Sequence, residues 1–291
     1  MIEGVFTALI TPFRDGQIDE EALRSLVERQ IEAGIDGLVP CGSTGESATL
    51  SHLEHRRVVE IVIAAVAGRV PVIAGTGSNS TREAVELTMH AKEAGAEGAL
   101  LLSPYYNKPT QEGIYAHYAA VAQETGLPIV IYNIPGRTAS NIAPETIGRL
   151  ARLENVIGIK EASGDLDQMA HVIAKSPSDF AVVSGDDSLT LPLLAIGGKG
   201  VISTSANVAP KQMCTLVREF VAGNLDAARE MHYRLLPLFD AIFCETNPIP
   251  LKAACAALGW CSDEIRLPLT PVSDANLEHL KVVLKDLGIA Q

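Results

Sequence analysis

Eight apolar runs alternate with amphipathic stretches up to about residue 222, and this alternation constrains the fold more than any other feature. The apolar runs resemble strands and lie at 5–11, 37–41, 70–75, 98–103, 128–133, 156–161, 180–185 and 200–204. The helical patterns lie near 20–34, 51–67, 81–95, 111–125, 144–152, 166–175, 188–196 and 210–222. Eight successive strand–helix units predict an α/β fold in which a parallel sheet closes into a (β/α)8 TIM barrel.

The last part of the chain breaks this alternation and carries helical patterns only, near 225–243, 248–258 and 274–287. We therefore expect a catalytic barrel domain over 1–224 and a C-terminal helical layer packed on it over 225–291. The length of 291 residues is usual for a single α/β barrel. A doubly wound open sheet is the competing architecture, but its Gly-x-Gly-x-x-Gly fingerprint is absent from the sequence.

The composition excludes several classes of protein. Hydrophobic residues make up 47% of the chain, which is enough for a large core and too many for a disordered protein. The net charge of -12 argues against nucleic-acid or anionic-membrane partners, because both require basic patches. The five cysteines form no Cys-x-x-Cys pair, so we expect neither a disulfide framework nor a metal site. We see no signal peptide or membrane-spanning run, and expect a cytoplasmic enzyme.

Polar residues follow the ends of many of the expected strands. In parallel barrels the active site lies at the carboxyl ends of the strands, so residues far apart in sequence meet at one mouth. The candidates, in chain order, are Ser43, Thr44, Tyr105, Tyr106, Tyr132, Arg137, Lys160, Gly185, Ile202 and Ser203. We expect these residues to contribute to one site.

Lys160 is the most informative of these residues, because it ends the otherwise apolar run 156–159. Desolvation disfavours an ammonium group, and the neutral amine that results is a nucleophile towards carbonyl carbon. This is the chemistry of Schiff-base formation. The structural alternative is a lysine that reaches from the strand end to water or pairs with Glu161.

Three further segments carry groups suited to such chemistry. The Gly-Ser-Thr-Gly-Glu turn at 42–46 offers N–H groups and hydroxyls for a carboxylate, or is only a turn before a helix capped by Ser47 or Thr49. Tyr132 offers a hydroxyl for proton transfer, or packs as a core aromatic. Arg137 suits bidentate binding of a carboxylate, or forms a surface ion pair.

These residues lie in segments that resemble the dihydrodipicolinate synthase family, within the pyruvate-dependent class I aldolase and N-acetylneuraminate lyase superfamily. The matching segments are 8–13 (ALITPF), 42–47 (GSTGES), 71–77 (PVIAGTG), 103–109 (SPYYNKP), 132–138 (YNIPGRT), 158–162 (GIKEA), 184–187 (SGDD) and 247–250 (NPIP). They run over nearly the whole chain and are jointly specific. The 42–46 turn and the lysine strand alone would identify only the superfamily.

The resemblance implies a lyase that needs no cofactor beyond a covalent pyruvate on Lys160. The lysine condenses with the ketone of pyruvate, and the resulting enamine attacks the aldehyde of L-aspartate-4-semialdehyde. Transimination then releases cyclic 4-hydroxy-tetrahydrodipicolinate, in the diaminopimelate route to lysine. The family's hydroxyl relay falls on Tyr132, Ser43 and Tyr106, and the last of these is supplied across a dimer interface.

The resemblance also assigns residues to substrate binding. Thr44 matches the residue that holds the pyruvate carboxylate, and Arg137 matches the one that binds the semialdehyde. Gly185 and Ile202 correspond to backbone contacts near pyruvate. One relay position departs from the pattern, because many family members have threonine where this chain has Ser43.

Two other hypotheses stay open beside the synthase, and Ser43 bears on the first of them. Serine retains the hydroxyl but lacks the β-methyl that restricts its rotamers, and it makes the turn similar to that of N-acetylneuraminate lyase. A sister lyase acting on N-acetylneuraminate or a sugar acid should lack the carboxylate-binding Arg137. A non-catalytic binder of a keto acid or of lysine is the third hypothesis, and the intact Lys160, Tyr132 and Tyr106 argue against it.

The resemblance further implies inhibition by L-lysine at a cleft between paired subunits of a homotetramer, a dimer of dimers. The matching effector positions are Ser47, Ala48, His52, His55, Asn79, Glu83 and Tyr105. From spacing alone, the two histidines are expected to share one helix face, for which a solvated face is the plain alternative. The segment 80–83 also predicts a capping box, so Glu83 has a structural role in either case.

Overall fold

The structure is a computed structural model that describes residues 2–290. Its main sheet has eight strands in the order β4-β1-β10-β9-β8-β7-β6-β5, and the printed pairings within it are parallel. The fold is a (β/α)8 TIM barrel with additional C-terminal helices, which confirms the predicted fold class. The strands are β1 Gly4–Ala8, β4 Gly37–Val39, β5 Ile73–Gly75, β6 Gly98–Leu102, β7 Ile129–Asn133, β8 Val156–Glu161, β9 Ala181–Ser184 and β10 Gly200–Ser203.

The helices fall close to the ranges predicted from the apolar periodicity. Those that alternate with the strands are α1 Glu20–Glu32, α2 His52–Val66, α3 Thr81–Ala94, α4 Gln111–Thr125, α6 Pro144–Leu150, α7 Leu166–Lys175, α8 Thr190–Ala195 and α9 Pro210–Val221. The C-terminal helices are α10 Leu225–Ile242, α11 Ile249–Ala257 and α12 Asp274–Asp286. Their ends differ from the predicted ones by a few residues at most, as expected for helix termini that fray.

Several short elements have no counterpart in the prediction. A small antiparallel hairpin joins β2 Phe13–Arg14 to β3 Gln17–Ile18, and one short helix, α5 Pro135–Thr138, follows β7. Three 3-10 turns, η1 Ser47–Thr49, η2 Asp187–Leu189 and η3 Ser205–Asn207, follow strands β4, β9 and β10. Elements of two to four residues are too short to produce a recognisable apolar period, and therefore escaped the sequence pattern.

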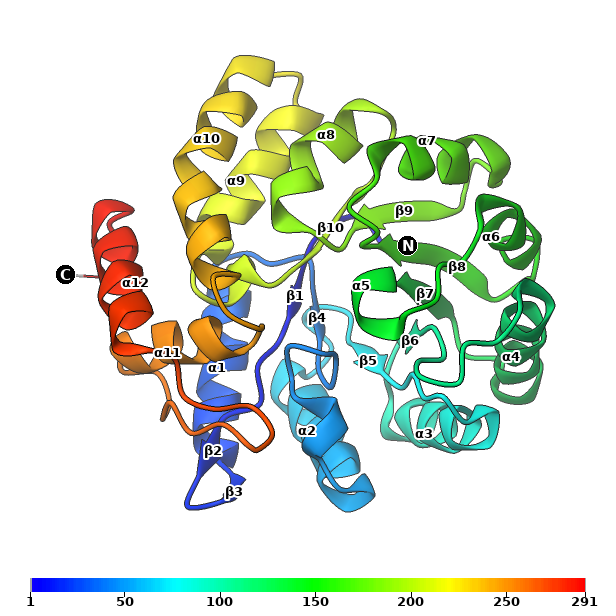
Figure 1. Cartoon of the computed structure of the whole chain (residues 1–291), viewed down its shortest axis with the longest axis horizontal. Helices are drawn as coiled ribbons and strands as arrows, with labels where there is room; N and C mark the ends of the chain where they lie inside the picture. Colours follow the sequence, from blue (N-terminus) through cyan, green and yellow to red (C-terminus); the bar gives the residue numbers. More distant parts are fainter. Residues whose placement is uncertain (1, 291) are drawn as a thin grey trace. The chain divides into compact units, whose positions relative to one another are not determined.

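The chain divides into two compact units. The first contains Val72–Ile202 with the N-terminal residues up to Gly4, and the second contains Val5–Pro71 with the residues from Ser203 onward. In the first unit, α3, α4, α6 and α7 lie along the outer side of strands β5 to β9 (Figure 1). The boundary predicted at 224/225 stays a prediction.

The central strands of the first unit position its functional groups. Every residue of β7 is buried, as expected for a parallel strand covered on both faces. The register pairs Tyr132 on β7 with Lys160 on β8, and Lys160 with Val183 on β9. The pairing places Tyr132 and Lys160 at the same level of neighbouring strands.

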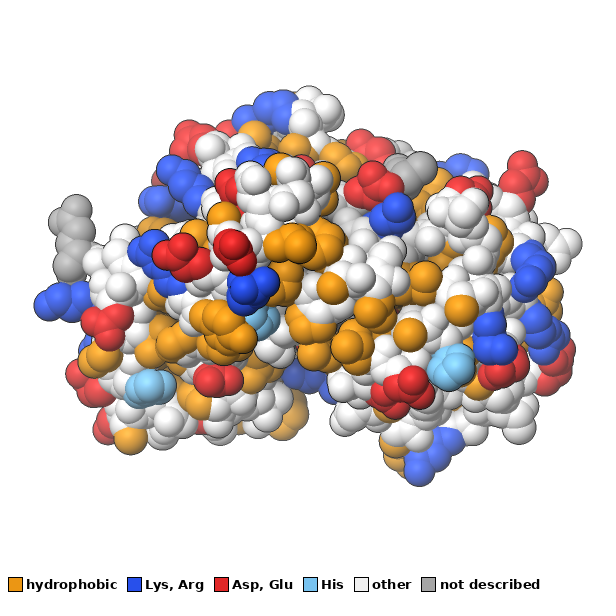
Figure 2. All heavy atoms as spheres, turned by 90° about the horizontal axis from the view of Figure 1, so that it is seen from above, with side chains coloured by type: hydrophobic (Ala, Val, Ile, Leu, Met, Phe, Trp, Pro, Cys, Tyr) orange, Lys and Arg blue, Asp and Glu red, His pale blue; other side chains and the backbone are white. Residues whose placement is uncertain are grey.

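In the second unit, α10 packs against α9 and α12, and α11 packs against α12. The inner face of α10 is apolar, with Leu235, Leu238 and Ile242 fully buried. Within residues 2–290, no helix is both long enough and apolar enough to cross a bilayer. On the face drawn in Figure 2, acidic and basic side chains are interspersed among apolar ones, and the described residues there form no continuous basic stripe.

Candidate active site

Lys160 and Tyr132 form the centre of the candidate site. The side chain of Lys160 is buried, with a residue exposure of 4%, and Tyr132 is buried to 5%. The Lys160 Nζ lies 4.4 Å from the centroid of the Tyr132 ring. Their contact follows from the β7–β8 register, because directly paired residues of adjacent strands point to the same face of the sheet. The amine is therefore held in a desolvated setting beside a phenol.

The structural alternatives for Lys160 do not hold. Lys160 is buried to 4% exposure, so its side chain does not extend over the protein surface. The Glu161 carboxylate is directed elsewhere and accepts hydrogen bonds from Asn133 Nδ2 at 3.1 Å, Ser163 N at 2.8 Å and Gln168 Nε2 at 3.3 Å. Burial nevertheless raises the pKa of Glu161, and those hydrogen bonds oppose the rise. Glu161 thus fixes the loop after β8 rather than neutralising the lysine.

Gly185 leaves the space that the lysine side chain occupies. A Cβ at this position would lie 2.5 Å from the Ala162 Cβ and 3.1 Å from the Lys160 Cε. Burial raises the pKa of the neighbouring Asp186 carboxyl, and the Lys160 cation opposes this rise. Ile202 lies on β10 and is completely buried. A side chain at 185 would force Ala162 to shift and would crowd Lys160.

Arg137 lies on α5, directly after β7, and its side chain is exposed. Thr138 anchors this helix, because it is fully buried and its Oγ1 donates to the carbonyls of Ile134 and Ser140 at 3.1 and 2.8 Å. Ser140 Oγ in turn donates to the carbonyl of Pro104 at 3.2 Å. A hydrogen bond therefore connects the loops that follow β6 and β7, and Arg137 lies on their exposed surface.

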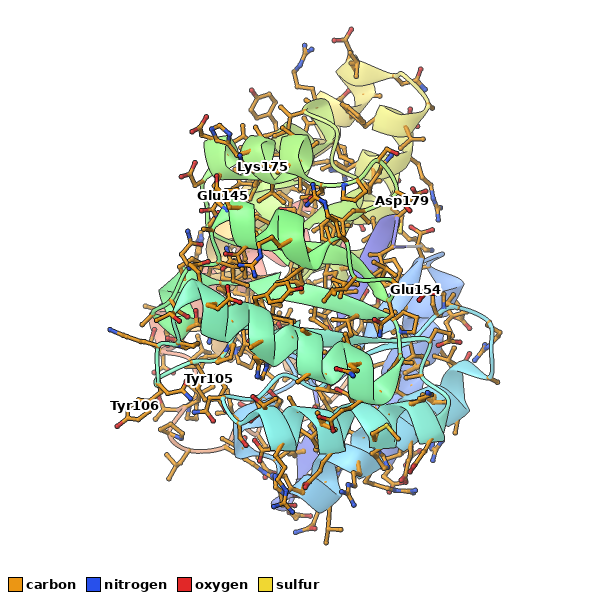
Figure 3. All side chains as sticks on the ribbon, turned by 90° about the vertical axis from the view of Figure 1, so that its right-hand side faces the viewer. Tyr105, Tyr106, Glu145, Glu154, Lys175 and Asp179 are labelled. Carbon is orange, nitrogen blue, oxygen red and sulfur yellow. The ribbon has the colours of Figure 1, made fainter. Side chains whose placement is uncertain are left out.

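Tyr105 and Tyr106 lie in the loop after β6 and mark one edge of the first unit, while Glu154 and Asp179 lie towards the other (Figure 3). Tyr106 is 88% exposed and has a φ of 70°, a left-handed conformation that is uncommon for a bulky residue. Burial raises the pKa of Tyr105, and the nearby Glu83 adds to this effect. Within one chain, the Tyr106 ring is presented to solvent rather than folded inward.

The 42–46 turn belongs to the second unit and is stabilised internally. Gly45 N and Ser47 N donate to the Gly42 carbonyl, and Glu46 N donates to the Ser43 carbonyl. Gly45 is required here, because a Cβ would lie 3.0 Å from the Leu9 carbonyl oxygen. The N–H groups of Ser43 and Thr44 donate to no acceptor among residues 2–290, so they remain available to a ligand.

The Thr44 hydroxyl is buried and positioned by two residues that the sequence analysis did not assign. Asn247 Nδ2 donates to Thr44 Oγ1 at 3.0 Å, and Thr204 Oγ1 lies 3.5 Å from it. The NPIP segment at 247–250 contained the only signal for Asn247, as one of the matching motifs. The turn thus has a preorganised hydroxyl.

A buried ion pair also stabilises the 42–46 turn. Lys252 on α11 is fully buried, and its Nζ lies 2.5 Å from Glu46 Oε1. The backbone N–H of Arg266 donates to Glu46 Oε2 at 3.1 Å, and the Phe13 ring lies 4.0 Å from the Lys252 Nζ. Burial lowers the pKa of Lys252, and the Glu46 carboxylate opposes this change. In the sequence, the signal for this pair is a lysine inside the otherwise apolar helix 249–257.

The proposed effector positions are distributed over both units. In the second unit, Ser47 and Ala48 lie in η1, and α2 begins at His52. The helix is capped by Ser51 in a capping box with Glu54, so the alternative that Ser47 or Thr49 caps it is wrong.

Both histidines lie in α2, but His52 is exposed whereas His55 is buried, so the alternative of a solvated helix face is wrong for His55. Positions three apart differ by about 60° around a helix, and the edge of the core runs between these two.

In the first unit, Asn79, Glu83 and Tyr105 lie close to the start of α3 or in the loop after β6. Ser80 caps α3 by accepting the Glu83 N–H at 3.5 Å, but the Ser80 N–H donates to Ser78 Oγ, so only the serine half of the predicted capping box is confirmed. The Glu83 carboxylate accepts a hydrogen bond from Ser78 Oγ. Asn107 Nδ2 donates to the Asn79 carbonyl at 2.9 Å, so the two segments are connected.

Comparisons with known proteins identify the family to which the chain belongs. Residues 1–287 match the model of the dihydrodipicolinate synthetase family. The chain belongs to this family. It is 58% identical over 289 residues to the 4-hydroxy-tetrahydrodipicolinate synthase of Syntrophus aciditrophicus, covering 99% of both chains.

Two solved structures extend the comparison. The dihydrodipicolinate synthase of Thermotoga maritima is 48% identical, with a TM-score of 0.98 and coverage of 99% of each chain. The enzyme from Cyanidioschyzon merolae, solved with lysine bound, is 43% identical, with a TM-score of 0.96 and coverage of 99% of this chain and 98% of that one.

Proposed function

We propose that this protein is a lyase that condenses pyruvate with L-aspartate-4-semialdehyde to form 4-hydroxy-tetrahydrodipicolinate. The observation that carries the proposal is the buried Lys160 amine, 4.4 Å from the Tyr132 ring on the next strand. A buried amine beside a tyrosine side chain supplies the two groups that imine formation needs, a nucleophile and a proton carrier. Membership of the family selects these substrates from the many that a Schiff-base lyase accepts.

The proposed steps use residues of this chain and no cofactor. The Lys160 Nζ attacks the ketone carbon of pyruvate, and Tyr132 donates a proton to the departing hydroxyl so that water leaves. The iminium then accepts the electron pair released when the pyruvate methyl loses a proton. The enamine attacks the semialdehyde carbonyl, which takes up a proton as the carbon–carbon bond forms. Attack by the substrate amine finally displaces Lys160 and closes the ring.

The remaining roles are assigned residue by residue. Thr44, with the free N–H groups of the 42–46 turn, holds the pyruvate carboxylate, and the contacts of its hydroxyl with Asn247 and Thr204 support this role. Arg137 binds the semialdehyde carboxylate from the surface of α5. The backbones of Gly185 and Ile202 lie next to the proposed pyruvate position.

Ser43 and Tyr106 are proposed to pass protons to and from Tyr132. The 88% exposure of Tyr106 supports a role in a neighbouring subunit, because its ring is presented outward from its own chain. Replacing Tyr106 by Phe should lower kcat and leave the fold unchanged. An unaltered kcat would show that this hydroxyl takes no part in the relay.

Reduction with borohydride in the presence of pyruvate tests the Schiff base. We expect an irreversible mass increase on the peptide that contains Lys160, and no increase in Lys160→Ala. Turnover is then measured with pyruvate and L-aspartate-4-semialdehyde, and separately with N-acetylneuraminate. Condensation that requires the semialdehyde supports the synthase, whereas cleavage of N-acetylneuraminate without condensation would assign the chain to the sister lyase.

We further propose that the protein is a homotetramer inhibited by L-lysine. The lysine-bound relative from Cyanidioschyzon merolae supports the existence of such a site in the family. In this chain the effector residues would be Ser47, Ala48, His52, His55, Asn79, Glu83 and Tyr105. Saturating L-lysine should lower the initial rate, and His55→Ala should weaken that effect. An unchanged rate at saturating lysine would remove this part of the proposal, and light scattering would settle the subunit number independently.

A further inference from the structure

Arg137 lies in a loop that is too short to hold its own conformation. This α5 loop, residues 134–143, contains only the four-residue helix α5 between β7 and α6. A single helical turn is not stable by itself in water, because fixing its backbone costs more free energy than its few hydrogen bonds return. The position of the guanidinium therefore depends on the contacts that the loop makes with the rest of the first unit.

A buried polar pair lies at the ends of β7 and β8. Asn133 is the last residue of β7 and Glu161 the last of β8, and both are completely buried and paired in the strand register. Successive side chains of a strand point to opposite faces, so this pair faces away from Tyr132 and Lys160. Asn133 Nδ2 donates to both carboxylate oxygens of Glu161 at 3.1 Å. Because both residues are shielded from water, these hydrogen bonds form a rigid support for what packs on them.

Asn141 connects the α5 loop to this pair. Its Oδ1 accepts from Asn133 Nδ2 at 2.8 Å and from Gln168 Nε2 at 3.1 Å, and its Nδ2 donates to Gln168 Oε1 at 2.6 Å. Gln168, on α7, also donates to the Glu161 carboxylate at 3.3 Å. Next in the chain, the Ile142 N–H donates to Asn133 Oδ1 at 3.1 Å. The Asn141 side chain and the backbone beside it are therefore attached to the same buried pair.

The side chain of Gln111, at the start of α4, holds the same segment independently. Its Nε2 donates to the Asn141 carbonyl at 2.8 Å, and its Oε1 accepts from the Ala143 N–H at 2.9 Å. The Thr146 hydroxyl donates to that Oε1 at 2.7 Å. The amide thus satisfies both a C=O and an N–H of one loop, as a neighbouring strand would. One side chain of the loop and one of α4 together restrain its backbone.

We propose that Asn141 and Gln111 are positioning residues for Arg137. By holding the α5 loop in one conformation, they place the guanidinium where the carboxylate of the second substrate binds, so the substrate does not have to order the loop. The bonds of Asn141 lie on the face of the sheet opposite to Lys160, so its effect falls on the second substrate and not on imine formation. This inference rests on the proposed function, from which it takes the role of Arg137.

Steady-state kinetics of the full-length enzyme measure the effect on each substrate separately. In Asn141→Ala, the KM for L-aspartate-4-semialdehyde should rise about five- to tenfold, because the substrate must then order a loop that the wild type holds in place. The kcat and the KM for pyruvate should stay unchanged, because pyruvate does not bind to Arg137. Gln111→Ala should give the same pattern. A general loss of structure would not distinguish the two substrates.

The Arg137→Ala background tests whether these residues act through the guanidinium. If they do, adding Asn141→Ala should change the KM for the semialdehyde by less than about twofold, because the group that is positioned is already absent. A further five- to tenfold rise in that background would show that Asn141 acts through another group, and would overturn the proposal.

Hydrogen exchange tests the restraint of the α5 loop without any substrate. Peptides that cover 134–143 should exchange faster in Asn141→Ala and in Gln111→Ala than in the wild type, because the loop opens more often when a side-chain bond is lost. Peptides from α9 and α10 should exchange at the wild-type rate. Unchanged exchange of 134–143 in both variants would refute the restraint, whatever the enzyme acts on.

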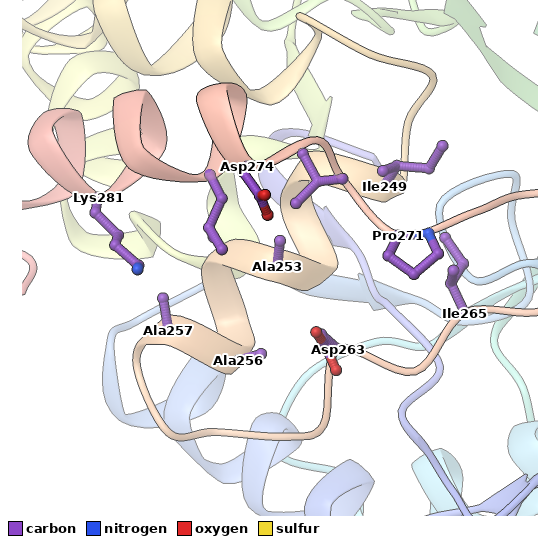
Figure 4. A pocket seen from close by; sticks show the side chains of 11 residues that line it. Ile249, Ala253, Ala256, Ala257, Asp263, Ile265, Pro271, Asp274 and Lys281 are labelled. Atoms are coloured by element: carbon purple, nitrogen blue, oxygen red, sulfur yellow. The ribbon is translucent and has the colours of Figure 1, made fainter.

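Two controls account for effects that do not come from the loop. Asn224→Ala removes an exposed amide that donates one hydrogen bond in the second unit, and should leave both KM values unchanged. Leu277→Ala enlarges a cavity of about 270 Å³ bordered by α11 and α12, which Ala253 also lines (Figure 4). This second control should lower stability and leave the KM for the semialdehyde unchanged. If it raised that KM as much as Asn141→Ala does, stability would be the cause and the proposal would be wrong.

The outcomes separate this inference from the proposed function. A wild-type enzyme that does not condense pyruvate with the semialdehyde refutes the proposed function, and hydrogen exchange then still decides whether Asn141 and Gln111 hold the loop. Condensation with a wild-type KM for the semialdehyde in both variants refutes the inference and leaves the proposed function intact.

Discussion

Replacing Lys252 by methionine should destabilise the protein far more than a surface lysine change does. Lys252 is fully buried, and its Nζ lies 2.5 Å from the buried Glu46 carboxylate. Methionine fills much of the same volume but leaves Glu46 with the Arg266 N–H and without the ammonium group that contacts it. Removing one partner of a buried ion pair costs about 3–5 kcal/mol. For a chain of this size, a change of 1 kcal/mol corresponds to roughly 2 °C in Tm, so we expect a fall of about 6–10 °C.

Scanning calorimetry at a fixed protein concentration and scan rate measures this shift, because assembly and irreversible steps both move the midpoint. The control is Lys281→Met, the same substitution in the exposed Glu278–Lys281 pair, which should change stability by no more than about 0.5 kcal/mol.

The double variant Glu46→Gln/Lys252→Met removes both charges and should recover most of the loss. If Lys252→Met lowers Tm no more than Lys281→Met does, or if the double variant is worse than either single one, the reasoning about the buried pair is wrong.

Three further predictions follow from the same structure. Gly185→Ala places a Cβ 3.1 Å from the Lys160 Cε and 2.5 Å from the Ala162 Cβ, so borohydride trapping of pyruvate should slow by about 100-fold while circular dichroism stays native. The bond from Arg266 lowers the pKa of Glu54 to about 2, below its usual 4.5. The stability that Glu54 contributes is therefore fully present above pH 4.5 and lost as the pH falls towards 2, and the Tm difference between wild type and Glu54→Gln should shrink across that interval. Burial lowers the pKa of His117 to about 4, so the unfolded chain binds the proton first and stability should fall as the pH drops from 6.5 to 4. His117→Gln should flatten that part of the wild-type Tm–pH curve, and a curve of unchanged slope would refute the assignment.

The element pattern of this protein was predictable from the sequence. Buried parallel strands are continuous apolar runs, and the helices that cover them have one apolar face, so both leave periodic signals over many residues. The hairpin β2–β3 and the helix α5 left no such signal, because two to four residues do not span a period. The candidate residues Lys160 and Tyr132 were also found in the sequence, through the chemistry of a lysine at the end of an apolar strand and the matching motifs around it.

The sequence alone determined which groups are present, and the tertiary structure decided which of them meet. The β7–β8 register places Lys160 beside Tyr132 and turns Glu161 towards Asn133. A change of this strand register by one residue would turn each of these side chains to the opposite face of the sheet. Glu46 and Lys252 are separated by 206 positions, and no local pattern pairs them. The apolar periodicity of a segment predicts whether it forms a helix or a strand. Contacts between side chains that are distant in sequence depend instead on how the segments pack.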